Sequence, residues 1–229
     1  AKQGFGQVAG EPALLRDMIG RRCQARAWQR WIEPLTAWLL HFLSTPLRLP
    51  ALPGVPTTSP VLASLPSSMA EMEFWLAAHA VKTTSIDALV CRYTLAGAVR
   101  PALQPGELNG MLKGFMDLVF EHEGRYYVAD YKSNWLGPDD AAYTPAAMGA
   151  TILHARYELQ YVLYLLALHR LLKARLPNYD YDRHVGGAVY VFLRGAHAPS
   201  QGLHVERPPR VLFAQLDALF ARGGMLETR

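Results

Sequence analysis

The sequence is poor in cysteine and has no long apolar run. Its 229 residues include two cysteines, Cys23 and Cys91. Neither lies in a CxxC pair or beside histidines at ligand spacing, which argues against a zinc site and a disulfide framework. No apolar run approaches the roughly 20 residues of a membrane-spanning helix, and no signal-peptide pattern opens the chain. We therefore expect a cytoplasmic protein in a reducing compartment.

Two catalytic motifs are also missing. No GxxxxGK[ST] loop for nucleotide phosphates occurs, so this chain is not expected to bind ATP itself. Ser133 stands beside Lys132, but no oxyanion-loop context supports a Ser–Lys nucleophile. The net charge of +4 is compatible with a polyanionic partner without arguing for one.

The N-terminal part has a helical pattern followed by a proline-rich stretch. Apolar residues recur at helical spacing between Pro12 and Phe42. They include an aromatic stripe of Trp28, Trp31, Trp38 and Phe42, which we interpret as core rather than as a base-stacking platform. Six prolines lie between Pro46 and Ser68, which is typical of an irregular connection. The sequence thus divides into a helical segment with its connection, residues 1–68, and a core, residues 69–229, that we expect to form one structural domain.

The second part mixes strand and helix patterns in a chain that is 51% hydrophobic. Alternation predicts a strand at Glu71–Ala77, and two further strands, Met111–Phe120 and Arg125–Lys132, form a hairpin. A long helix is predicted at Tyr157–Ala174, and a continuous apolar strand at Gly186–Gly195. The fold class is therefore α/β, with a mixed sheet flanked by helices.

The hairpin carries charged residues on strands that are otherwise apolar. Asp130 and Lys132 are two apart and share a face of the sheet. With an even turn, Asp117 falls on that same face, directly opposite Asp130 or diagonal to it. Two buried carboxylates this close repel one another unless a positive charge intervenes. A solvated Asp–Lys pair is the plainer interpretation of a bare DxK, but the apolar flanks favour a site.

A magnesium ion would neutralise both carboxylates. Mg²⁺ prefers oxygen ligands and takes one or two protein carboxylates together with phosphate. Asp117 and Asp130 offer such oxygens, and the backbone carbonyl of Tyr131 offers another. The metal would polarise a phosphodiester and acidify a bound water, while Lys132 would stabilise developing charge.

The residues around this hairpin resemble a known family. Asp117, followed thirteen residues later by Asp130-Tyr131-Lys132, is similar to the PD-(D/E)xK nuclease core. Longer stretches resemble one branch of this superfamily, the RecB-like nuclease domains. They are "GMLKGFMDLVF", "HEGRYYVADYKSNWLG", "LQYVLYLLALHR" and "YDYDRHVGGAVYVFLRG". The resemblance covers roughly Glu107 to Gly195 and implies a restriction-endonuclease-like fold.

The resemblance also implies roles for individual residues. Asp117 and Asp130 would be metal ligands, with Asp130 also central to catalysis, and Lys132 would be the catalytic lysine. The Q-x-x-x-Y signature of the family falls on Gln160 and Tyr164, which would hold the DNA backbone or support the metal ligands. Glu71 would correspond to an acidic residue on the first core strand of the family.

The implied activity is Mg²⁺-dependent exonucleolytic and endonucleolytic hydrolysis of DNA in double-strand break repair and recombination. Within a RecBCD-type helicase–nuclease, the implied partners are DNA, RecC, RecD and the strand-exchange protein RecA, with the ATP-binding motor upstream. The family carries a metal-binding histidine in a G-x-x-x-H motif before the aromatic helical region, and this sequence lacks that motif. We therefore expect a piece of a longer chain. Two alternatives stay open. One is a non-catalytic module that docks RecA and is inactive because the helix that carries this histidine is missing, and the other is an inactive structural domain.

Overall fold

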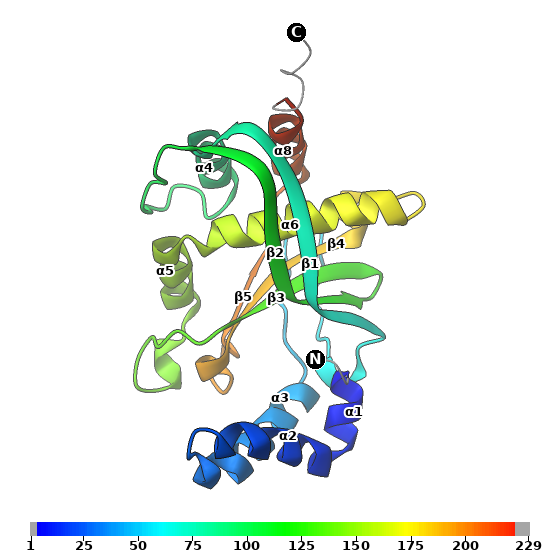
Figure 1. The fold of residues 1–229 in the computed structure, drawn as a ribbon, viewed down its shortest axis with the longest axis vertical. Helices are drawn as coiled ribbons and strands as arrows, with labels where there is room; N and C mark the ends of the chain where they lie inside the picture. The colour runs from blue at the N-terminus through cyan, green and yellow to red at the C-terminus, as the bar shows by residue number, and fades with distance from the viewer. Residues whose placement is uncertain (1–3, 223–229) are drawn as a thin grey trace.

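A five-stranded mixed sheet forms the centre of the protein (Figure 1). The computed structural model describes residues 4–222. The strands lie side by side in chain order, and β3 pairs with β4 in parallel while the other neighbours are antiparallel. They are β1 Ser67–Lys82, β2 Glu107–His122, β3 Arg125–Lys132, β4 Val185–Phe192 and β5 Leu203–Glu206. The predicted mixed α/β sheet is confirmed.

Helices cover both faces of the sheet. One core lies between the sheet and the helices that follow β1, and it includes Val128, Tyr190 and Leu165. These helices are α4 Thr83–Tyr93, α5 Pro145–Ala155, α6 Tyr157–Arg175, α7 Tyr181–His184 and α8 Arg210–Arg222. The opposite face packs against the N-terminal segment at the lower end of Figure 1. That segment contains α1 Phe5–Gly10, α2 Pro12–Gln24 and α3 Ile32–Ser44.

The central strands follow from local rules. Every residue of β4 is buried, as expected for an apolar strand between β3 and β5 with helices on both sides. The β2–β3 hairpin turns through Glu123 and Gly124, whose positive φ angles suit a two-residue turn. Thr144 caps α5 by accepting a hydrogen bond from the Ala147 amide, with Pro145 in the first turn.

The N-terminal segment departs from the prediction. The helical pattern from Pro12 to Phe42 is broken between α2 and α3, where the φ angle of Ala27 is positive. The break turns Trp28 and Trp31, the first two aromatic residues of the stripe, toward solvent, where they are 53% and 46% exposed. The expectation that the whole stripe is core was therefore wrong. Spacing alone does not reveal a helix break, because residues on both sides keep the same period.

No helix within residues 4–222 is both long enough and apolar enough to cross a membrane. The connection at residues 46–66 is irregular, as its prolines indicate, with two isolated bridges, Leu49–Thr58 and Leu52–Val55. Gln201 fastens this connection to the body of the protein. Its Oε1 accepts a hydrogen bond from the Arg48 amide at 2.8 Å, and its Nε2 donates to the Pro46 carbonyl at 3.0 Å.

Candidate active site

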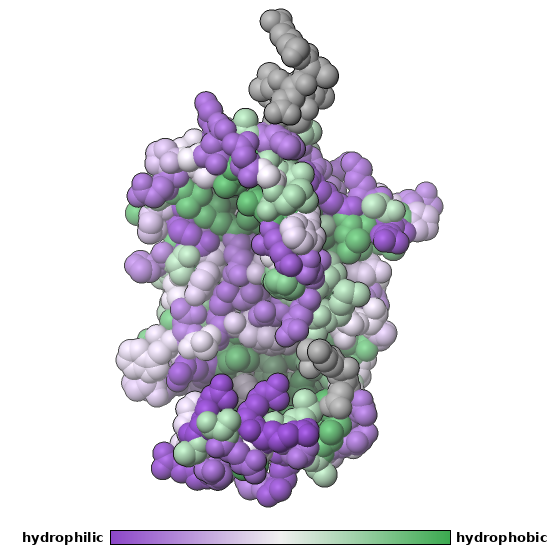
Figure 2. All heavy atoms as spheres, viewed as in Figure 1, coloured by the Kyte–Doolittle hydropathy of each residue, from purple (hydrophilic) through white to green (hydrophobic). Residues whose placement is uncertain are grey.

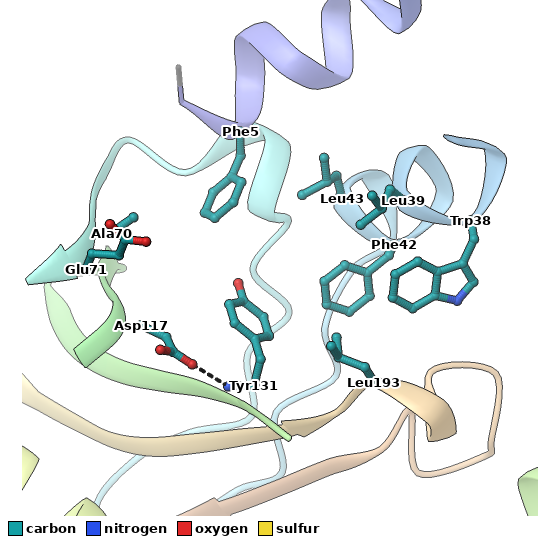
Figure 3. Close-up of a pocket in the computed structure, with 10 residues that line it drawn as sticks. All are labelled: Phe5, Trp38, Leu39, Phe42, Leu43, Ala70, Glu71, Asp117, Tyr131 and Leu193. Atoms are coloured by element: carbon teal, nitrogen blue, oxygen red, sulfur yellow. Dashed lines mark hydrogen bonds between the residues drawn. The ribbon is translucent and has the colours of Figure 1, made fainter. Parts of the chain in front are cut away.

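The hairpin register brings Asp117 beside Asp130. The last pairs of the β2–β3 ladder run from His122–Arg125 to Leu118–Ala129, and one further step places Asp117 opposite Asp130. The Asp117 Oδ2 accepts a hydrogen bond of 2.9 Å from the Tyr131 amide (Figure 3). The Asp117 side chain therefore links β2 to the backbone of β3 through one carboxylate oxygen, and its second carboxylate oxygen takes no part in this bond.

Lys132 is held by a carboxylate, an amide and two aromatic rings. Its Nζ lies 2.5 Å from the Asp130 Oδ2, and it donates to the Gln160 Oε1 at 2.8 Å. The same Nζ stands 4.0 Å from the ring centroid of Tyr157 and 4.5 Å from that of Tyr190. The side chains of Lys132 and Asp130 are 10% and 6% exposed. The ammonium is thus fixed in a nearly enclosed position, with its donors directed by the protein rather than by water.

Gln160 connects this lysine to the first half of α6. Its Oε1 also accepts a hydrogen bond from the Tyr190 hydroxyl at 2.8 Å, and its Nε2 donates to the Tyr164 hydroxyl at 2.7 Å. Gln160 and Tyr164 are four apart and share one face of the helix. The structure therefore brings the predicted Gln160 and Tyr164 into one hydrogen-bonded network with Lys132.

Burial governs the protonation of this network. Burial raises the pKa of the Asp130 carboxyl above its usual value, while the Lys132 ammonium lowers it and the Asp117 charge raises it. Burial, with the Asp130 charge, raises the pKa of the Tyr164 hydroxyl to about 12. Burial also raises the pKa of Tyr190 far above its ordinary value. Both tyrosines are therefore neutral hydrogen-bonding groups at physiological pH.

Glu71 lies farther along the same region, at an interruption of the sheet. Pairing of β1 with β2 passes from Ala70–Leu118 to Met72–Met116 and skips Glu71 and Asp117. Glu71 has a positive φ there, which is unusual for a residue other than glycine. Glu71 and Asp117 line one pocket of about 400 Å³, whose other walls come largely from the N-terminal segment (Figure 3).

That pocket joins a charged end to apolar walls. In Figure 3 the Tyr131 ring points into it from β3, and the Trp38 and Phe42 rings stack beside it with centroids 5.5 Å apart. In the space-filling view, hydrophilic side chains gather across the middle of the visible face, and the surface is hollowed above the N-terminal helices (Figure 2).

The oxygen donors suit a hard cation. Within residues 4–222 no three His, Cys, Asp or Glu side chains cluster as a metal site. Asp117 and Asp130 still supply two carboxylates, and the Tyr131 carbonyl belongs to the residue whose amide binds Asp117. Mg²⁺ accepts such a small set because it keeps several waters and takes phosphate oxygens as well. The residues present are compatible with this ion.

Tyr157 and Tyr190 were missed by the sequence analysis. Tyr190 lies within the apolar run of β4, where an aromatic residue signals core packing. Tyr157 begins α6 and has the same ordinary appearance. No spacing or motif marks either residue, because their relation to Lys132 depends on how α6 and β4 meet β3.

The chain has recognisable relatives. The family profile described as the PD-(D/E)XK nuclease superfamily matches residues 11–225. RecB of Escherichia coli, described as a RecBCD enzyme subunit, is 44% identical over 195 residues, which cover 84% of this chain and 16% of that protein. RecB of Haemophilus influenzae is 37% identical over 198 residues, which cover 84% of this chain and 15% of that protein. RecB of Mycobacterium tuberculosis is 39% identical over 125 residues, which cover 51% of this chain and 11% of that protein.

The chain thus spans about one sixth of the length of the E. coli and H. influenzae relatives. The profile match extends over both the N-terminal segment and the sheet, and it includes the hairpin with Asp117, Asp130 and Lys132. With its mixed sheet and flanking helices, the chain belongs to the PD-(D/E)XK nuclease superfamily and is similar to the nuclease domain of RecB.

Proposed function

We propose that this domain hydrolyses DNA phosphodiesters with Mg²⁺ and uses Asp117, Asp130 and Lys132. The observation that carries the proposal is the enclosed Asp130–Lys132 pair beside Asp117, in a chain of a nuclease superfamily. A buried ion pair contributes little to stability on its own account, because desolvation offsets the attraction. A site that needs a fixed ammonium beside a metal-binding carboxylate gives this pair a chemical purpose.

The roles follow from the contacts. Asp117, Asp130 and the Tyr131 carbonyl would hold Mg²⁺, which when bound would polarise the phosphate and acidify a water. Lys132 would stabilise the charge that develops on the phosphate oxygens. Gln160 orients the Lys132 ammonium through its Oε1, and Tyr164 in turn holds the Gln160 amide. Glu71, which lines the same charged end of the pocket as Asp117, would contact the DNA or support the metal ligands.

The wider role is proposed from the relatives. Their printed name describes RecB as a subunit of the RecBCD enzyme. We infer that this domain works in the cytoplasm within a RecBCD-type helicase–nuclease, beside RecC and RecD, in double-strand break repair and recombination. The ATP-binding motor would lie in another part of the longer chain. RecA is a predicted partner by the resemblance alone.

Cleavage of single-stranded and duplex DNA, titrated with Mg²⁺, tests the catalytic proposal. The chain and the longer protein that contains it are compared with their Asp117→Asn and Asp130→Asn forms. Glu73→Gln, a change at an exposed strand carboxylate, is the matched control. We expect each Asp→Asn change to lower the rate at least about 100-fold, since a metal ligand is lost.

Equal rates in Asp130→Asn and Glu73→Gln would contradict the proposal. A folded protein that cleaves no DNA in any form, yet retains RecA, would favour the non-catalytic alternative instead.

A further inference from the structure

The loop that follows β3 presents a tryptophan to solvent. Trp135 stands three residues after Lys132 and is 68% exposed, the highest value among the large aromatic side chains that the structure describes. A single exposed apolar side chain is common on protein surfaces and by itself needs no functional explanation. What distinguishes Trp135 is the rigidity of the backbone that carries it.

Bonds on both sides of Trp135 fix this backbone. The Tyr143 hydroxyl donates to the Asn134 carbonyl at 3.2 Å and accepts from the Leu136 amide at 3.4 Å. One residue earlier, the Ser133 carbonyl accepts from the Arg194 Nε at 3.0 Å. Tyr143 is itself buried. The indole is therefore held outward by a preformed loop, so that binding would cost little loop-ordering entropy.

The same loop touches the lysine site. The Tyr157 hydroxyl donates to the Asn134 Oδ1 at 3.5 Å, and the ring of Tyr157 lies 4.0 Å from the Lys132 Nζ. One side chain thus separates the residue before Trp135 from the proposed catalytic lysine. A ligand that contacts Trp135 would lie close to a phosphate positioned at Lys132.

A cavity of about 410 Å³ opens beside the indole, and Trp135, Tyr143, Arg194, Asp139 and Asp140 are among the residues that line it. Arg194 is exposed and uses its Nε on Ser133, which leaves the rest of its guanidinium for a ligand. Asp139 is occupied by its own turn, because its side chain accepts from the Ala141 amide.

These groups match the chemistry of a nucleobase with its phosphate. An indole face stacks on any base, and a guanidinium binds phosphate or stacks beside the base. The Asp140 carboxylate could accept a hydrogen bond from an exocyclic amino group. A base inside a duplex has both faces covered by its neighbours, whereas an unpaired nucleotide has a free face that can stack on Trp135.

We propose that Trp135 and Arg194 form a nucleobase subsite that positions single-stranded DNA next to the scissile phosphate. This inference rests on the proposed nuclease function and specifies its substrate as an unpaired strand at this point. Trp135 is then a substrate-binding residue and the loop of residues 133–143 is its support.

The test compares Trp135→Ala, Trp135→Phe and Trp28→Ala in the longer protein. Trp28 is the matched control, since it is also an exposed tryptophan but lies in the N-terminal segment. Binding of a fluorescein-labelled oligothymidylate is measured by anisotropy without divalent cation, so that no cleavage is needed. Cleavage of the same oligonucleotide with Mg²⁺ then gives kcat and KM.

We expect Trp135→Ala to weaken binding and to raise KM about tenfold, as for the loss of one stacked base. The kcat should change little, and Trp135→Phe should recover most of the affinity because it keeps an aromatic ring. Cleavage of blunt duplex DNA should respond less than cleavage of the single strand. Circular dichroism melting checks that the exposed substitution leaves the fold intact.

Equal binding and KM in Trp135→Ala and Trp28→Ala would overturn the subsite while leaving the nuclease proposal standing. The same holds if Trp135→Ala lowers only kcat, or affects duplex and single strand alike. Conversely, loss of oligothymidylate affinity in a protein that cleaves no DNA would retain the subsite and reject the nuclease proposal.

Discussion

Two lysines on neighbouring strands have similar partners and opposite surroundings. Lys113 on β2 lies 3.2 Å from the Glu73 carboxylate, with its Nζ 4.8 Å from the Trp75 ring centroid and 5.2 Å from that of Phe115. Lys132 on β3 likewise has one carboxylate and two aromatic rings within similar distances. The Lys113 and Glu73 side chains are 42% and 40% exposed, whereas Lys132 is 10% exposed.

The difference shows what enclosure adds to the same set of contacts. An exposed pair such as Glu73–Lys113 is screened by water and holds no fixed geometry. The Lys132 ammonium contacts Asp130, Gln160 and two aromatic rings instead of bulk water, so its charge acts in a medium of lower dielectric constant. A carboxylate and two aromatic rings around a lysine can thus describe a solvated surface on one strand and a proposed reactive group on the next.

The largest expected contrast is in catalysis. Lys132→Met should lower the DNA cleavage rate about 10³-fold, because a fixed positive charge is removed from the developing phosphate charge. Lys113→Met removes a lysine of similar contacts and should leave the rate within about twofold. The measurement is kcat on single-stranded DNA at saturating Mg²⁺. Comparable losses in the two variants would end the distinction drawn between the lysines.

The next contrast concerns the amide that holds Lys132. Gln160→Leu leaves the Lys132 ammonium and the Tyr190 and Tyr164 hydroxyls without a shared partner in a buried position. We expect the free energy of unfolding to fall by about 2–3 kcal/mol. The matched variant is Gln215→Leu, which removes one hydrogen bond to the Tyr93 hydroxyl and should cost about 1 kcal/mol.

Urea titration followed by circular dichroism measures both values. If the two glutamine variants were equally stable, the network around Lys132 would be no tighter than an ordinary helix contact.

Enclosure should also act on an imidazole beside this network. His204 on β5 pairs with Tyr190, and burial lowers the pKa of its imidazole to about 4. The unfolded chain binds the proton below about pH 6.5, while the folded protein stays neutral to about pH 4, so stability falls as pH drops through this window. Between pH 7 and pH 5 the loss from this group is roughly 2 kcal/mol.

His204→Gln should remove that part of the acid sensitivity, and the exposed His79→Gln should not. Thermal or urea unfolding at pH 7 and pH 5 gives the comparison. An unchanged pH dependence in His204→Gln would show that burial at this edge does not control the imidazole.

The smallest effect belongs to the exposed pair. A double-mutant cycle of Glu73→Gln and Lys113→Met should give a coupling energy below about 0.5 kcal/mol, and salt should reduce it further. Unfolding free energies of the four proteins at low and at moderate salt measure it. A coupling above about 1 kcal/mol, the upper end for exposed ion pairs, would mean that exposure does not weaken this pair.

Much of the hairpin was predictable because its rules are local. The period of two predicts that Asp130 and Lys132 share one face, and an even turn was the condition for Asp117 to face them. The structure has such a turn at Glu123 and Gly124, and its register places Asp117 opposite Asp130. The buried β4 was predicted on equally local grounds, from its continuous apolar run. The chemical roles of the carboxylates and of Lys132 stay predictions that the cleavage assays test.

The remaining features depend on contacts between distant parts of the chain. Local patterns predicted that Asp130 and Lys132 share a face and that β4 is buried, since side-chain alternation and apolar runs act over a few residues. Three features follow from packing alone: Tyr157 and Tyr190 enclose Lys132, Trp28 faces solvent after a helix break, and Trp135 is held outward beside the site. Enclosure is a property of packing, and packing joins residues that no local pattern relates.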